Sequence, residues 1–278
     1  MMPRVLLVLC MSLAVLGDIP TTTPGFTFKE GRKDAPVHLE VFIDLLCPYS
    51  KAAYPALKKL GNAFHGKDFR LTFQVLPLPF HRNAFIAAQS AVTLVHAAGA
   101  DAFVPWLETI YINQDKLSNA ATKDVTPTQL IKQLASWATT AFPTVSLVEF
   151  TKHMQPGSEM DEKTRQLFRY SLAHGISGTP MFYLNGVHFN DADSGWSFDD
   201  WFKVIDPLVQ ANKEAIAPVM ALHAMLPDRK VYMHASDSTC SGQARCDFAD
   251  GKTMCCTASS EVCIVRYGCK NEDLLAIE

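Results

Sequence analysis

The feature that most constrains the fold is a strand pattern that leads into a Cys-Pro turn and then a helix. Within Val37–Ile43 an apolar residue occupies every second position, which is typical of a buried β-strand. Cys47 and Pro48 follow closely, and residues 51–64 are rich in helix-forming side chains. Proline is tolerated in the first turn of a helix because the backbone N–H that it lacks has no partner there. The pattern therefore predicts a strand, a short turn and a helix, with Cys47 at the helix start.

Cys47 is the candidate nucleophile of the chain. Unpaired backbone N–H groups and the helix dipole stabilise an anion at the first turn of a helix, so a thiolate is favoured there. The thiolate is the form of cysteine that attacks a disulfide. The alternative interpretation is a buried and inert cysteine, and the position at a helix start argues against it.

The cysteines fall into three groups. Of the eight, Cys10 lies near the N-terminus, Cys47 stands alone, and six cluster towards the C-terminus at Cys240, Cys246, Cys255, Cys256, Cys263 and Cys269. In an oxidising compartment an even number of clustered cysteines is expected to pair internally. We therefore expect Cys47 to be the free thiol of the mature chain.

The first residues have the pattern of a secretory signal peptide. Arg4 precedes an apolar run, Val5–Leu16, that is too short to span a bilayer comfortably, and Gly17 suits cleavage before Asp18. We expect residues 1–17 to be a signal peptide, with an uncleaved anchor as the alternative. No later run is apolar enough for a membrane span, and the final residues are not a KDEL-type retrieval signal. The expected location is outside the cell or in the lumen of the secretory pathway.

Composition narrows the function classes. The chain has 278 residues, is 48% hydrophobic and 19% charged, and carries a net charge of −3 with no long basic run. Nucleic acid is therefore not an expected partner. The length allows one well-packed domain of roughly 200 residues and a smaller part. The oligomeric state is left open.

Further elements follow the first strand and helix. Phe69–Leu76 alternates as a strand, and Ala84–Ala98 is apolar at helical spacing. Helices are predicted at 101–113, 127–140, 145–153 and 159–174, with a capping box at Thr126. Asn185 and Gly186 predict a type I′ hairpin, and Ser197 begins a last helix. The expected core residues of these helices are Phe103, Trp106, Ile110, Trp137, Phe150, Phe198, Trp201, Phe202 and Ile205. For a minority of the first five, the alternative is that they line a peptide groove.

Several motifs appear in an order that resembles the DsbA-like branch of the thioredoxin superfamily. They are Asp34–Val37, Asp44–Tyr49, Pro55, Leu76–Ala84 and the Gly-Thr-Pro segment of Ile176–Gly186. The resemblance implies an α/β thioredoxin-like fold over residues 18–213, with a helical insertion at about 83–174. It also implies a cis Thr179–Pro180 bond facing the active site, and a Thr179 backbone that pairs with substrate. The implied site residues are Cys47, Pro48, Tyr49, Ser50, Thr179 and Pro180, with His81 as a further candidate.

Ser50 is the departure from that family that matters most. The usual motif is C-x-x-C, and its second cysteine releases the substrate from a mixed disulfide, which a serine hydroxyl cannot do. A carboxylate that the family often buries six residues before the nucleophile is replaced here by Val41. Asp44 is nearer, and because its charge would disfavour a thiolate, we expect it to be solvated or to cap the turn. What remains is monothiol exchange.

The C-terminal cysteines define a separate module at 236–278, after a poorly patterned linker at 214–235 that we expect to be partly helical. Their order resembles an inhibitor cystine knot, which would pair Cys240 with Cys256, Cys246 with Cys263, and Cys255 with Cys269. Other pairings are open from spacing alone. Zinc is disfavoured because no C-x2-C pair or neighbouring histidine occurs. The loop Asp247–Lys252 is either a contact surface for a receptor, channel or protease, or part of a stabilising or client-docking tail.

Three functions are compatible with these patterns. The first is monothiol exchange on protein or peptide thiols and disulfides: isomerisation, deglutathionylation or client trapping, with glutathione as a candidate co-substrate and no tightly bound cofactor or metal. The second is a non-catalytic binding protein, chaperone-like or a secreted ligand. The third is a relative of kappa-type glutathione transferases, whose turn shares Pro48–Ser50. The signal peptide and Cys47 itself argue against the third.

Overall fold

The computed structural model describes residues 23–29, 31–224, 232–234, 244–247 and 253–256. The predicted signal peptide lies outside these residues. The chain divides into two units, Met1–Asp206 and Pro207–Glu278, and each is described by itself. None of the helices in the described ranges is long and apolar enough to cross a membrane.

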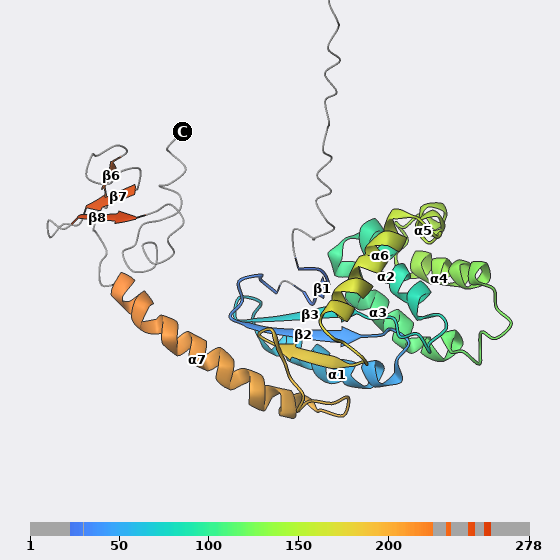
Figure 1. Ribbon diagram of the computed structural model, residues 1–278, viewed down its shortest axis with the longest axis horizontal. Coiled ribbons are helices and arrows are strands. Elements are labelled where there is room, and N and C mark those ends of the chain that lie inside the picture. Colours follow the sequence, from blue (N-terminus) through green and yellow to red (C-terminus); the bar gives the residue numbers. More distant parts are fainter. Residues whose placement is uncertain (1–22, 30, 225–231, 235–243, 248–252, 257–278) are drawn as a thin grey trace, which may run out of the picture. The chain divides into compact units, whose positions relative to one another are not determined.

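The first unit is built on a five-stranded sheet of order β1-β3-β2-β4-β5 (Figure 1). Its central strands, β2 and β3, are parallel, and the other pairs are antiparallel. Two parallel strands need a crossover between them, and the helix after Cys47 supplies it. The strands are β1 Phe26–Thr27, β2 Val37–Ile43, β3 Phe69–Val75, β4 Met181–Leu184 and β5 Val187–His188.

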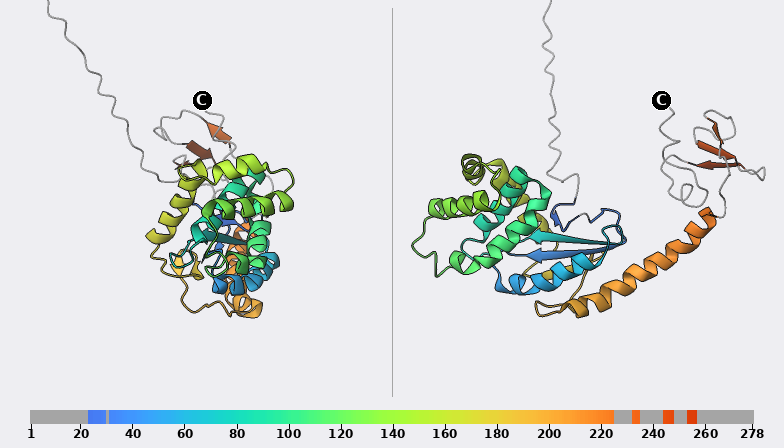
Figure 2. Two further views of the ribbon diagram at one scale, coloured as in Figure 1. Left: turned by 90° about the vertical axis from the view of Figure 1, so that its right-hand side faces the viewer. Right: turned by 180° about the vertical axis from the view of Figure 1, so that it is seen from behind.

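Helices cover both faces of the sheet and form a block at one end of it (Figures 1 and 2). The block lies between β3 and β4 in sequence, as expected for a helical insertion. The structure therefore confirms the predicted α/β thioredoxin-like fold with a DsbA-type insertion. The helices are α1 Pro48–Ala63, α2 Ala84–Ala98, η1 Ala100–Ala102, α3 Phe103–Ile112, η2 Gln114–Leu117, α4 Pro127–Ala141, α5 Leu147–His153, α6 Glu159–Ala173 and α7 Phe198–Ala224.

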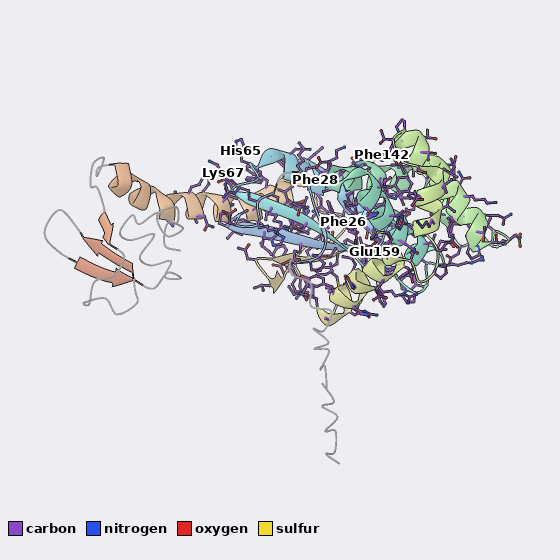
Figure 3. All side chains as sticks on the ribbon, turned by 90° about the horizontal axis from the view of Figure 1, so that it is seen from above. Phe26, Phe28, His65, Lys67, Phe142 and Glu159 are labelled. Carbon is purple, nitrogen blue, oxygen red and sulfur yellow. The ribbon has the colours of Figure 1, made fainter. Side chains whose placement is uncertain are left out.

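The two sheet faces pack against different helices because strand residues alternate in direction. On one face, Phe73 of β3 contacts Tyr54 of α1, with ring centroids 6.1 Å apart. On the other face, Phe42 of β2 stacks on Tyr170 of α6 at 6.4 Å. β1 ties the sheet to the helical block: Phe26, labelled in Figure 3, stacks on Phe103 of α3 with centroids 4.0 Å apart.

Most of the predicted core is confirmed. Phe103, Trp106, Ile110 and Phe150 are buried in the helical block, and Trp201 and Ile205 are buried on α7. Three expectations were wrong. Trp137 and Phe198 are only partly buried, and the Lys116 ammonium lies 5.9 Å from the centre of the Trp137 ring. Phe202 is 37% exposed, and its ring stacks on that of Phe64 with centroids 5.5 Å apart.

Local signals set the ends of these elements. Thr126 and Gln129 form the predicted capping box at the start of α4. Asn185 and Gly186 both have positive φ, 50° and 79°, as a type I′ hairpin between β4 and β5 requires. The last helix begins after Ser197 as predicted and continues to Ala224, so residues 214–224 of the expected, partly helical linker are helical.

The described part of the second unit contains a three-stranded antiparallel sheet of order β6-β7-β8. Its strands are β6 Tyr232–His234, β7 Ala244–Asp247 and β8 Thr253–Cys256. Cys246 lies opposite Met254 in the register of β7 and β8. Each of the three predicted disulfides includes a cysteine outside the described residues, so the pairing stays a prediction.

Candidate active site

Cys47 occupies the N-cap position of α1, as the sequence predicts. Its backbone is extended (φ −76°, ψ 123°), and Pro48 stands in the first helical turn. The Cys47 carbonyl accepts a hydrogen bond from the Lys51 N–H at 3.1 Å, which closes the first turn of the helix. Cys47 is a free thiol, although it is only 3% exposed. The helix start thus presents one sulfur at the end of β2.

The Thr179–Pro180 segment faces that sulfur. The peptide bond between these residues is cis, as predicted. Phe42 pairs with Met181 in the β2–β4 register, so the residues before β4 lie beside the turn after β2. The Cys47 thiol donates a hydrogen bond to the Thr179 carbonyl oxygen at 3.2 Å. The Thr179 hydroxyl is buried and has no hydrogen-bond partner among the described residues.

The other two residues of the turn have opposite environments. Ser50 is fully buried, and its hydroxyl lies 3.4 Å from the Asp44 N–H, close to the limit of a hydrogen bond. Tyr49 is 64% exposed. The position that a second cysteine would occupy is therefore inside the protein, and it carries an oxygen that cannot form a disulfide.

Asp44 holds the turn together from inside. Its side chain is fully buried and accepts hydrogen bonds from the Leu46 N–H at 2.8 Å and the Leu78 N–H at 3.1 Å. Of the two expected alternatives, a solvated carboxylate or one that caps the turn, the structure shows the second, and the residues after β2 and β3 enclose the side chain. Burial raises the pKa of Asp44 above its ordinary value, against the opposing effect of its hydrogen bonds to His81, Leu46 and Leu78.

His81 reaches the site through Asp44. Parallel β2 and β3 end at the same edge of the sheet, so the residues that follow each strand meet there. His81 Nδ1 lies 2.6 Å from Asp44 Oδ2, and the imidazole side chain is 21% exposed. Its ring contacts that of Phe80, which is 63% exposed. The prediction that His81 faces the site is thus supported by a direct contact with the turn.

Two further residues of the helical block were not predicted: Gln114 contacts the turn, and Tyr111 packs against Tyr54 of α1 with ring centroids 5.6 Å apart. The Gln114 side-chain amide donates to the carbonyl oxygens of Leu45 and Cys47, at 3.1 and 3.2 Å. The Tyr111 phenol is buried, and its hydroxyl has no partner among the described residues. Burial first, and then the charges of Asp44, Cys47 and Tyr54, raise the pKa of Tyr111. Nothing in the local sequence distinguishes this glutamine or tyrosine, because the insertion brings them to the site.

The sheet beneath the site carries no carboxylate at Val41. That side chain is buried at a position opposite Phe73 and Phe182. The neighbouring Glu40 is buried on the other face, where it accepts hydrogen bonds from Gln74 at 2.9 Å and Tyr170 at 3.3 Å. Among the described residues, no three His, Cys, Asp or Glu side chains are grouped to hold a metal ion.

The fold and the thiol define a class: a thioredoxin-like domain with a helical insertion and one cysteine at the start of the first long helix. A profile of the family described as Thioredoxin matches residues 26–207, which is more than half of the chain. The chain belongs to the thioredoxin family.

Solved structures share this fold at low sequence identity. A putative protein-disulfide isomerase from Pseudomonas syringae aligns with a TM-score of 0.54 and 17% identity, covering 62% of this chain and 94% of that one. Oxidised BdbD from Bacillus subtilis aligns with a TM-score of 0.53 and 18% identity, covering 67% and 93%. These likenesses support the fold. No curated protein matches the chain.

Proposed function

We propose that the protein is a monothiol thiol-disulfide exchange protein of the secretory pathway or the extracellular space. The observation that carries the proposal is the position of Cys47, a free thiol at the N-cap of α1 that contacts the residue before cis Pro180. Membership of the thioredoxin family and the signal-like N-terminal sequence support it. The substrates are disulfides of proteins or peptides.

The reaction consists of two thiol-disulfide exchange steps. In the first, the Cys47 thiolate attacks a substrate disulfide, a mixed disulfide forms, and the released thiolate takes a proton. In the second, a thiol from the substrate or from glutathione attacks the mixed disulfide and regenerates Cys47. No net oxidation occurs when both thiols belong to the same substrate, which makes the cycle an isomerisation. Removal of glutathione from a protein follows the same two steps.

Ser50 determines which cycle is available. A second cysteine at this position would attack the mixed disulfide from within the protein, whereas the buried Ser50 hydroxyl has no such chemistry. Release must therefore come from an external thiol. The mixed disulfide is expected to be long-lived when no such thiol is present.

The test compares the wild-type protein with Cys47→Ser on a protein substrate whose disulfides have been scrambled, in a glutathione buffer. Wild type is expected to speed recovery of the native substrate, and Cys47→Ser is expected to match the uncatalysed rate. The variant keeps every C-terminal cysteine, so it also controls for exchange elsewhere. Equal recovery by the two proteins would refute the proposal.

A second candidate is binding without chemistry. Cys47 is only 3% exposed, while the aromatic side chains of Tyr49 and Phe80 are largely exposed beside the site residues. An apolar surface of this kind can hold an unfolded chain without a covalent bond. Client capture that is equal for wild type and Cys47→Ser, and insensitive to reductant, would favour this function.

A further inference from the structure

We propose that His81 is a positioning residue for Cys47 that acts through Asp44, by compensating the charge of this buried carboxylate and holding it against the turn. The inference rests on the proposed function of Cys47, and it assigns a role to a pair that takes no part in the covalent steps.

The first step is the geometry of Asp44. Its Oδ1 accepts the Leu46 N–H, and its Oδ2 accepts both the Leu78 N–H and His81 Nδ1. Its backbone carbonyl accepts the Cys47 N–H at 3.1 Å. One residue therefore connects the turn that carries the nucleophile with the segment after β3. His81, at 2.6 Å, forms the shortest of these contacts.

The second step is charge. A carboxylate three residues before Cys47 disfavours the thiolate, since like charges raise each other's energy in a buried site. His81 Nδ1 lies 2.6 Å from Asp44 Oδ2, and an imidazole at this distance makes the pair neutral whenever it carries a proton on both nitrogens. From the helical block, Gln114 contributes a neutral amide, which donates to the carbonyl oxygens of Leu45 and Cys47.

Asp44 and Cys47 lie in the same buried part of the site. Asp44 is fully buried, Cys47 is 3% exposed, and the Asp44 backbone carbonyl accepts the Cys47 N–H at 3.1 Å. A charge on Asp44 is therefore poorly screened from Cys47, because buried charges are screened much less than exposed ones. Ser50 adds only a weak contact to the Asp44 N–H. A positive charge on His81 offsets the charge of Asp44 and therefore reduces the repulsion between Asp44 and the Cys47 thiolate.

The experiment measures the rate at which iodoacetamide alkylates Cys47, followed by mass spectrometry of the Cys47 peptide, at several pH values. His81→Gln keeps a polar group but cannot carry a positive charge. It is expected to slow alkylation about tenfold near neutral pH, which corresponds to the effect of one nearby like charge. The exposed His188, on β5, supplies the matched control His188→Gln, whose rate should equal that of wild type.

The double variant Asp44→Asn, His81→Gln separates charge from structure. If His81 acts by compensating Asp44, removal of the carboxylate should return the rate to within about threefold of wild type. If His81 only supports the fold, the double variant should react as slowly as His81→Gln or show broader loss of structure by circular dichroism, which would overturn the inference. Alkylation needs no substrate disulfide, so this result stands apart from failure of the exchange assay.

Discussion

The Cys47 thiol donates its hydrogen bond to the carbonyl oxygen of Thr179, 3.2 Å away and 132 residues later in the chain. The contact exists because β4 pairs with β2, so the segment before one strand meets the turn after the other. It places the reactive atom beside a backbone rather than beside an acidic or basic side chain. The chemistry of the site is thus governed by the helix start and by the groups beneath the turn.

Restoring a second cysteine should change how substrate is released. Ser50→Cys places a thiol in the same helical turn as Cys47, and internal attack on the mixed disulfide becomes available. The Cys47 adduct of a model disulfide should then disappear without added glutathione. Mass spectrometry after removal of free thiols measures this, with Ser136→Cys on α4 as a control for an added thiol elsewhere. An adduct that persists equally in Ser50→Cys and wild type would contradict the release model.

Gln114 should matter for both stability and rate. Its side-chain amide donates hydrogen bonds to the carbonyl oxygens of Leu45 and Cys47. Gln114→Ala removes both hydrogen bonds and leaves two buried acceptors without this donor. Unfolding in urea should show a loss of about 1–3 kcal/mol. Exchange at Cys47 should slow as the turn loosens. The exposed Gln133, on α4, offers a control substitution to alanine, and equal effects of the two variants would argue against this role.

The buried Asp44 should make the free energy of unfolding decrease as the pH rises. Burial raises its pKa in the folded protein, so the folded state keeps a proton at pH values where the unfolded chain has lost it. The stabilisation of the folded state by protonated Asp44 is complete below the pKa of about 3.9 that an aspartate has in the unfolded chain. It is lost as the pH rises through the pKa of Asp44 in the folded protein. Wild type should therefore lose stability relative to Asp44→Asn as the pH rises from about 3.9 through the raised pKa of the folded protein. A difference in unfolding free energy that is constant over this range would disprove the assignment.

A substitution inside the helical insertion should lower the stability of the protein without changing the reactivity of Cys47. The Trp106 indole N–H donates to the Ser90 hydroxyl at 3.0 Å, and both side chains are fully buried. Ser90→Ala removes the acceptor and should cost about 1–3 kcal/mol of unfolding free energy. Alkylation of Cys47 in Ser90→Ala should keep its wild-type rate. The same is expected for Ser136→Ala, a control substitution at an exposed serine. A slowed rate in Ser90→Ala alone would show that the insertion is coupled to the nucleophile.

Sequence patterns predicted the framework of the site because its determinants are local. Alternation in Val37–Ile43, the Pro48 at a helix start and the Asn185–Gly186 turn each act within a few residues, and each is found in the structure. The contact between Cys47 and Thr179 was anticipated by family resemblance, which supplied the long-range pairing that spacing alone does not contain.

The predictions failed where tertiary packing decides the outcome. Asp44 was expected to be solvated or to cap the turn, and spacing did not decide between the two; residues after β3 bury it in the capping role. Gln114 and Tyr111 belong to the insertion, and nothing in their neighbourhoods indicates that they approach Cys47. Phe202 has the spacing of a core residue but stays partly exposed, because its partner Phe64 lies at the end of α1. Such contacts depend on how elements dock, which a periodic pattern does not encode.

The most direct test of the central claim is to trap the mixed disulfide. The purified protein is mixed with a peptide that carries a glutathione or aryl disulfide, quenched with acid, and analysed by peptide mass spectrometry, with Cys47→Ser alongside. A disulfide adduct is expected on Cys47, where it persists until glutathione is added and then disappears, and no corresponding adduct is expected in the variant. An unmodified Cys47 in the folded protein, or an adduct that forms equally in Cys47→Ser, would contradict the central claim.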